Sequence, residues 1–177
     1  MANISLTRVN QKLAQARALL TSAGDSPLVP IHLAALQEAV VFHLVCAYRH
    51  YLREIAETYG LKQSAGIATE SDLAEAFRLA KKHPAEADEL IALRENKGAW
   101  LGQLHSYYET LWSVPVLSVA TVEAKIERES EESASIIKLV NIDPAPALVA
   151  VDMTLLASWH VEFVALVGRQ RETSAEF

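Results

Sequence analysis

Several features that usually identify a function are scarce in this chain. It has a single cysteine, Cys46, which excludes a disulfide framework and a cysteine metal cage. Cys46 lies in an apolar run, where a cysteine is typically a small buried hydrophobe and not a reactive thiol. The sequence also lacks a glycine-rich phosphate loop, a serine nucleophile elbow and a His-Glu-x-x-His motif. The sequence therefore offers none of these enzyme signatures.

Positive charge and aromatic side chains are also in short supply. The 177 residues carry a net charge of −6, so we expect no general electrostatic attraction to nucleic acid or to an anionic membrane. Aromatic residues make up only 7%, while Ala and Leu are frequent, which favours helices over sheets. The N-terminal residues 1–13 lack the basic-then-apolar pattern of a signal peptide, so we expect a cytoplasmic protein.

The stretch Pro30–Tyr59 is predicted to form one long central helix. Proline is tolerated at a first helical position, and Gly60 follows where a left-handed terminating residue is expected. Apolar residues recur at steps of three or four: Leu33, Leu36, Val40, Leu44, Ala47, Tyr51, Ile55 and Tyr59. The run 39–48 is apolar almost all the way round, which requires cover on every side, and is only about half of a membrane span. We therefore expect a core helix and no membrane insertion.

The remaining chain predicts an all-α protein with five to six helices. The helices expected around the central one are Ser5–Ser22, Glu70–Lys82 with Thr69 as its cap, one opened by Pro84, one from Trp100 to Trp112, and about 152–171. Asn96-Lys97-Gly98 is expected to kink or break the helix that Pro84 opens. We predict an irregular antiparallel helical bundle, with a single domain at 1–172 and a frayed tail at 173–177. The acidic segment 120–150 is predicted to be a solvated helix or a flexible loop.

Histidine and carboxylate side chains on the central helix suggest a metal site. His43 and His50 are seven residues apart, and Glu54 follows one turn later, so the three share roughly one face. A second helix would have to complete the site, and His105 with Glu109 is another pair at helical spacing. The alternative is that His43 is a core histidine while His50 and Glu54 form a surface pair. No Glu-x-x-His motif is present, which argues against a ferritin-like di-iron site, and we expect no resident cofactor.

Arg78 and His83 suggest a different chemistry. Their spacing resembles the Arg-x4-6-His motif of the helical nucleotide-binding domains of higher eukaryotes and prokaryotes, many of which are metal-independent ribonucleases. The resemblance implies that His83 would act as general acid or base and that Arg78 would steady phosphate charge. In those proteins the motif usually lies late in the chain, whereas here it precedes the midpoint. The alternative is a plain charge cluster at a helix end.

A polar stripe on the first helix suggests a ligand surface. Arg8 and Lys12 share a face there, with Asn10 and Gln11 between them, so a carboxylate or phosphate could lie across the two cations. The alternative is ordinary solvation of a helix surface.

Three stretches together resemble an uncharacterised family of small all-helical bacterial proteins, known only as a domain of unknown function. They are Thr7–Lys12, Gln37–Leu44 and the closing run Val164–Arg171, which ends in Gly-Arg-Gln-Arg. The resemblance implies one helical domain and no assigned activity, cofactor or site.

If the family pattern includes polar residues of the first two helices, a ligand-binding cluster between those helices is expected. Its candidate residues are Arg8, Asn10, Gln11, Lys12, Glu38 and His43. Glu38 and His43 are about 140° apart round a helix, so another helix would have to help one small ligand touch both.

The sequence leaves three functions open. We expect a non-enzymatic protein that acts through protein–protein contact or self-association, because no specific catalytic constellation is present and the last third is acidic. The first alternative is a metal-independent ribonuclease using Arg78 and His83. The second is a metal- or small-ligand-binding bundle using His43, His50 and Glu54.

Overall fold

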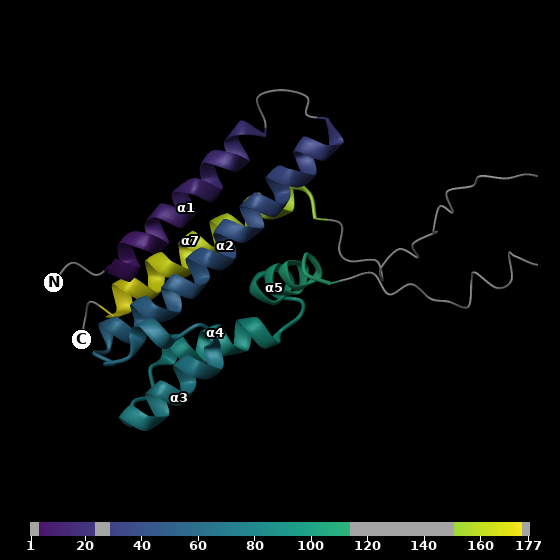
Figure 1. The fold of residues 1–177 in the computed structure, drawn as a ribbon. Helices are drawn as coiled ribbons and strands as arrows, with labels where there is room; N and C mark the ends of the chain where they lie inside the picture. The colour runs from purple at the N-terminus through teal and green to yellow at the C-terminus, as the bar shows by residue number, and fades with distance from the viewer. Residues whose placement is uncertain (1–3, 24–28, 114–150, 175–177) are drawn as a thin grey trace, which may run out of the picture.

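A computed structural model describes residues 4–23, 29–113 and 151–174, and within them six α-helices and no strand are present (Figure 1). The elements are α1 (Ile4–Ser22), α2 (Pro30–Thr58), the short 3-10 helix η1 (Ser64–Gly66), α3 (Glu70–Ala80), α4 (Ala85–Glu95), α5 (Trp100–Thr110) and α7 (Met153–Ser174). The predicted all-α class is confirmed. The acidic segment 120–150, for which a solvated helix or flexible loop was predicted, lies outside the described residues.

The three long helices lie side by side, and α2 occupies the middle of the molecule. In Figure 1, α1 runs antiparallel to α2, and α7 runs alongside both towards the end where N and C are marked. The shorter α3, α4 and α5 lie on the other side of α2, and α2 contacts α1, α3, α5 and α7. The predicted helical bundle around the long central helix is therefore confirmed.

Local capping chemistry explains why the helices begin and end where they do. Thr69 Oγ1 accepts a hydrogen bond from the Asp72 N–H at 3.2 Å, and the Asp72 carboxylate accepts one from the Thr69 N–H at 2.9 Å. This reciprocal pair is a capping box, which satisfies N–H groups that an α-helix leaves open at its start. At the end of α2, Gly60 has a φ of 72°, a left-handed conformation that glycine adopts without strain.

The sequence Asn96-Lys97-Gly98 forms a true break and not a kink. Helix α4 ends at Glu95 and α5 begins at Trp100. The chain folds back so tightly that a Cβ at Gly102 would overlap the Asn96 carbonyl oxygen. Gly102 thus permits the close approach that lets α4 and α5 pack as separate helices.

Several helix ends differ from the predicted bounds: α2 ends at Thr58 and α5 at Thr110, and α3 and α7 also differ. Helix α3 stops at Ala80, because Lys81 adopts a left-handed φ of 55°. Helix α7 continues to Ser174, two residues into the tail that was expected to fray. The Ser174 hydroxyl donates a hydrogen bond to Glu86 Oε1 at 3.0 Å, which holds this end of the helix against α4.

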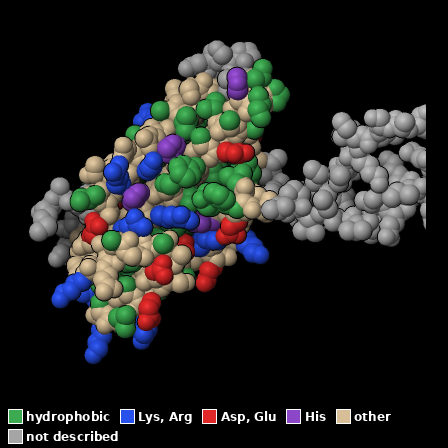
Figure 2. Space-filling model, viewed as in Figure 1, with side chains coloured by type: hydrophobic (Ala, Val, Ile, Leu, Met, Phe, Trp, Pro, Cys, Tyr) green, Lys and Arg blue, Asp and Glu red, His purple; other side chains and the backbone are tan. Residues whose placement is uncertain are grey.

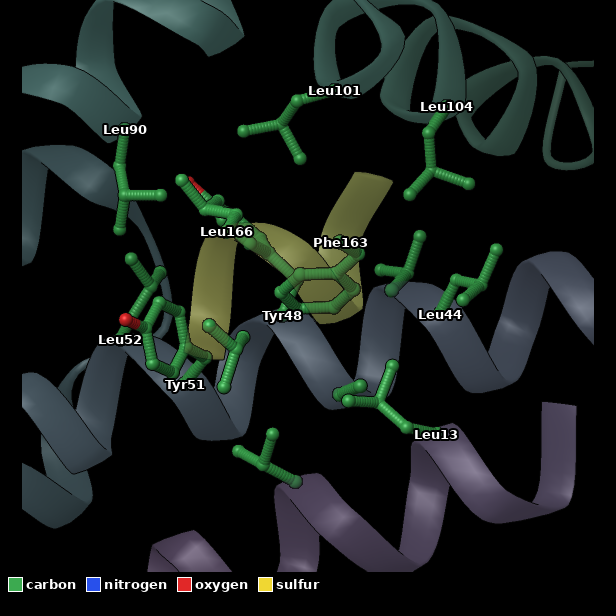
Figure 3. Close-up of a cluster of buried hydrophobic side chains, with 14 of the residues drawn as sticks. Leu13, Leu44, Tyr48, Tyr51, Leu52, Leu90, Leu101, Leu104, Phe163 and Leu166 are labelled. Carbon is green, nitrogen blue, oxygen red and sulfur yellow. The ribbon is translucent and has the colours of Figure 1, made fainter. Parts of the chain in front are cut away.

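Phe163 of α7 lies at the centre of the hydrophobic core (Figure 3). Its side chain is fully buried, and its ring centroid lies 5.4 Å from that of Trp100, 6.2 Å from Tyr48 and 6.1 Å from Tyr51. Leucines from five helices surround these rings: Leu13, Leu44, Leu52, Leu90, Leu101, Leu104 and Leu166. The core therefore joins α2 and α7 to every other described α-helix, with α3 contributing Leu73 and Phe77.

Helix α2 is the one described helix that is long and apolar enough to cross a membrane by length and composition alone, with a mean hydropathy of 1.5 over its best window. This window is longer than the apolar run 39–48, because it also takes in the less apolar turns on either side of that run. Core helices of soluble proteins pass the same test. Eleven residues of α2 are buried, and 33% of its most apolar window is buried inside the protein.

Truncating a core leucine should destabilise the protein far more than truncating an exposed one. Leu52 is fully buried and Leu79 is 68% exposed, so Leu52→Ala creates a cavity and Leu79→Ala does not. We expect Leu52→Ala to lower the free energy of unfolding by about 2–5 kcal/mol, measured by urea denaturation. Leu79→Ala is the matched control and should unfold at the wild-type midpoint; equal losses in the two variants would contradict this core.

Candidate functional site

An ion pair between a buried carboxylate and a half-buried guanidinium joins the central helix to the C-terminal helix. Arg171 donates from Nε to Glu54 Oε1 at 2.6 Å and from Nη2 to Glu54 Oε2 at 2.9 Å. Its remaining nitrogen, Nη1, donates to Asn10 Oδ1 at 3.0 Å. The Glu54 side chain is only 4% exposed, so this bidentate pair replaces the water that the carboxylate loses on burial. One guanidinium therefore ties together α1, α2 and α7.

The two residues before Arg171 connect α7 to α4. Arg169 contacts both oxygens of Glu89, at 2.6 and 3.1 Å, and this contact lowers the pKa of the Glu89 carboxyl. Gln170 is buried; it accepts a hydrogen bond from the Tyr51 hydroxyl at 2.7 Å and donates one to Glu89 at 2.7 Å. The Gly-Arg-Gln-Arg ending thus acts as a structural clasp between helices.

A cavity of about 250 Å³ lies next to this clasp. Its lining residues are Leu6, Tyr51, Glu54, Ile55, Thr58, Arg171 and Ser174. The polar groups at its wall are already hydrogen-bonded: Thr58 to the Glu54 carbonyl at 2.9 Å and Ser174 to the Gln170 carbonyl at 2.9 Å. Since the charges there neutralise each other, the cavity presents a mainly apolar wall.

The metal-site hypothesis is not supported by this arrangement. Glu54 is engaged by Arg171, and it is not the surface partner of His50 that the sequence suggested. Within residues 4–23, 29–113 and 151–174, no group of three His, Cys, Asp or Glu side chains is placed to hold a metal ion. His43, His50 and Glu54 are therefore not brought together as a ligand set.

The proposed nuclease pair lies on the protein surface. Arg78 is bound through two nitrogens to Glu75, each at 2.6 Å, and this pairing raises the pKa of the Arg78 guanidinium. His83 is exposed and lies beyond the end of α3, after the left-handed Lys81. The structure gives Arg78 a carboxylate partner within its own helix, which reduces its availability for phosphate.

Part of the polar stripe predicted on the first helix does form a common surface with α2. Burial lowers the pKa of His43 and of His50, and Lys12 lowers both further; His50 is also affected by Arg53 and Arg8. These effects place the cations of α1 opposite the histidines of α2. Figure 2 shows Lys, Arg and His side chains gathered over α1 and α2, beside a group of hydrophobic side chains.

The other candidate ligand residues have different neighbours. Gln11 accepts a hydrogen bond from Arg8 at 2.8 Å on the same surface. Asn10, in contrast, reaches Arg171, and Glu38 lies close enough to Tyr107 of α5 to raise the pKa of that hydroxyl after burial. The predicted cluster is therefore divided among three places.

Two buried polar atoms near this surface have no hydrogen-bond partner among the described residues. They are Gln15 Oε1 on α1 and His43 Nδ1 on α2. Buried polar atoms are normally paired, and leaving one unpaired costs free energy. Because both atoms are buried, this unused hydrogen-bonding capacity lies beneath the surface of α1 and α2.

Sequence reasoning missed a second polar cluster, made by Tyr48, Glu70, Arg94 and His105. The rings of Tyr48 and His105 lie 5.1 Å apart, and Arg94 Nε lies 3.8 Å from Glu70 Oε1. Burial first, and the Glu70 carboxylate second, raise the pKa of Tyr48. Burial lowers the pKa of His105 to about 3, helped by Arg94. Glu109, which the helical spacing paired with His105, is instead bound by Arg94 at 2.8 Å.

Removing Arg171 should leave a buried carboxylate without its counter-charge. We expect Arg171→Met to lower the free energy of unfolding by roughly 3 kcal/mol, measured by urea denaturation. Replacing both partners, Glu54→Leu with Arg171→Met, should restore much of that loss. Arg78→Met, which breaks the exposed pair with Glu75, is the control and should leave the unfolding midpoint unchanged. A wild-type midpoint for Arg171→Met would contradict the role of the clasp.

Because folding keeps His105 neutral, the protein should lose stability as the pH falls. Because its pKa falls from 6.5 to about 3 on folding, the unfolded chain binds the proton first. Its stabilising effect is complete above the unfolded pKa and is lost as the pH falls from there towards the folded value. We expect His105→Gln to lose less stability than the wild type between about pH 7 and about pH 4.5, in urea titrations. Equal losses in both proteins would refute this assignment.

Comparison with known proteins assigns the chain to a family but to no activity. No curated protein and no solved structure matches the chain. A family model described as a family of unknown function, DUF6586, matches residues 1–177. The resemblance read from three stretches of the sequence is therefore confirmed, and the chain belongs to this family of unknown function.

Proposed function

We propose that this protein is non-enzymatic and acts through protein–protein contact or self-association, in a bacterial cytoplasm. The observation that carries the proposal is an exposed aromatic edge, which we define as Phe42 of α2, Tyr108 of α5 and Trp112 just after α5. Phe42 is 46% exposed and Trp112 is 72% exposed. Large exposed aromatic side chains are enriched in interfaces, where they bury much area at small entropic cost.

The aromatic edge is held in place by its own contacts. The rings of Tyr108 and Trp112 lie 6.0 Å apart, and the Arg49 guanidinium lies 5.8 Å from the Tyr108 ring centroid. Phe42 packs edge-on against His43 at 5.7 Å. The edge therefore presents a shaped surface at the junction of α2 and α5, as a docking site requires.

The distribution of polar residues supports binding over catalysis. Arg78 and Glu54 are both occupied by ion pairs, and Asn10, Arg169, Gln170 and Arg171 connect helices to one another. In these contacts the polar side chains hold the helices together. Arg49 of α2, in contrast, is exposed and has no carboxylate partner among the described residues.

Photo-crosslinking from the aromatic edge tests this proposal. A photoreactive phenylalanine analogue at Phe42 should yield adducts heavier than the protomer in native host cells, resolved by mass spectrometry. The same analogue at Leu79, which is 68% exposed on α3, is the control and should yield little. Adducts containing two copies of this chain would identify self-association, and adducts with another chain a hetero-complex. Protomer alone at Phe42, or the same adducts from both positions, would refute the proposal.

A further inference from the structure

A set of cations flanks the aromatic edge and forms a surface that we define as the basic face. It consists of Arg8 and Lys12 of α1 with Arg49, His50 and Arg53 of α2. Lys12 and Arg49 both act on the Cys46 thiol, lowering its pKa against the larger raising effect of burial. Since Cys46 is half-buried between them, these charges line a single strip along α2. Cys46 was expected to be a small buried hydrophobe, and its partial exposure shows that the strip is open to solvent.

The cations of the basic face lack carboxylate partners among the described residues. Arg94, Arg169 and Arg171, in contrast, each have a carboxylate within 4.0 Å. Arg8 donates to the neutral Gln11, Arg53 donates to the Ile67 carbonyl at 2.8 Å, and Arg49 lies over an aromatic ring. Uncompensated positive charge on a chain of net charge −6 concentrates an attraction for anions on this one surface.

The one carboxylate that acts on His50 is already occupied. Glu57 raises the pKa of His50, against the larger lowering effects of burial, Arg53, Arg8 and Lys12. Its Oε1 accepts hydrogen bonds from Ser5 at 2.7 Å and from Ser64 at 3.4 Å. Glu57 keeps its negative charge while it accepts these bonds and therefore offsets part of the positive potential at His50, whereas Arg8, Lys12 and Arg49 have no carboxylate partner among the described residues.

The spacing of the charges indicates the shape of the partner. Arg8 and Lys12 are four residues apart on α1, and Arg49 and Arg53 are four apart on α2, so each pair rises by about 6 Å along its helix. Carboxylates at positions i and i+4 of a partner helix repeat at the same distance. Phe42, Tyr108 and Trp112 lie along one side of this strip and can receive apolar side chains.

We infer that the basic face and the aromatic edge together bind an acidic amphipathic helix of a partner protein, with its carboxylates on the basic face and its apolar side chains on the aromatic edge. The inference rests on the proposed function and names its partner's chemistry. Single-stranded nucleic acid also combines negative charge with stacking groups, but the net charge of −6 works against its approach.

Fluorescence anisotropy with a defined peptide tests the inference. The probe is a fluorescein-labelled acidic amphipathic peptide of about four helical turns, with Glu at i and i+4 and Leu and Phe on the adjoining face. A scrambled peptide of the same composition and a short oligo-dT are the comparison probes. We expect the amphipathic peptide to bind most tightly, more weakly as salt is raised, and Lys12→Glu with Arg49→Glu to weaken its binding by about tenfold or more.

Lys97→Glu is the control, because it makes the charge change of one of these two substitutions at an exposed residue outside the face. It should leave peptide affinity within about twofold of the wild type. Calorimetry in two buffers of different ionisation enthalpy should also show proton uptake on binding, since the carboxylates of the peptide favour protonated His50. Circular dichroism of each variant establishes that it is folded.

The outcomes separate the inference from the proposed function. Tighter binding of oligo-dT than of the peptide, equal weakening by Lys97→Glu, or no peptide binding at low salt would overturn the inference. If crosslinks from Phe42 persist while the peptide does not bind, association stands and the acidic helix is the wrong occupant. If both fail, the surface has no docking role.

Discussion

The bidentate contact between Arg171 and Glu54 is the interaction on which the arrangement of the three long helices depends. It joins the C-terminal end of α7 to a buried carboxylate of α2, and Asn10 brings the first helix to the same guanidinium. Because a buried carboxylate without its partner is costly, this contact allows one relative placement of α1, α2 and α7 and disfavours others. The apolar core around Phe163 then fills the space that this placement creates.

With α7 fixed in this way, one side of α2 is committed to the core and the other remains open to solvent. The core side carries Tyr48, Tyr51 and Leu52, and the open side carries Phe42, Arg49 and Arg53. Helix α1 contributes cations to one flank of the open side, and α5 contributes aromatic rings to the other. The same packing that stabilises the fold therefore assembles a mixed basic and aromatic surface from three separate helices.

Local sequence signals predicted the helices well, because caps and apolar spacing act within a few residues. Thr69 and Asp72, Pro30 and Gly60 determine boundaries through contacts close in the chain. The polar pairings were not predictable in this way. Glu54 and Arg171 are 117 residues apart, and helical spacing pointed from Glu54 to His50. Only the tertiary fold reveals that Glu54 turns inward while His50 faces α1.

The candidate site divides along the same line. Spacing on one helix correctly suggested that Arg8 and Lys12 share a surface, and the family resemblance directed attention to the first two helices. Neither the spacing nor the resemblance could show that Asn10 binds Arg171, that Glu38 lies near Tyr107, or that Arg49 lies over the ring of Tyr108. Those assignments depend on which helix lies beside which, and this is decided by core packing.

The central claim is that buried polar residues maintain the fold while the open side of α2 does the binding. Hydrogen–deuterium exchange of the protein with and without the acidic amphipathic peptide tests it most directly. The account predicts new protection confined to residues 8–12, 42–53 and 108–112, with exchange in α4 and in the clasp of α7 unchanged. Protection centred on the cavity beside Arg171, or spread evenly over all helices, would contradict it.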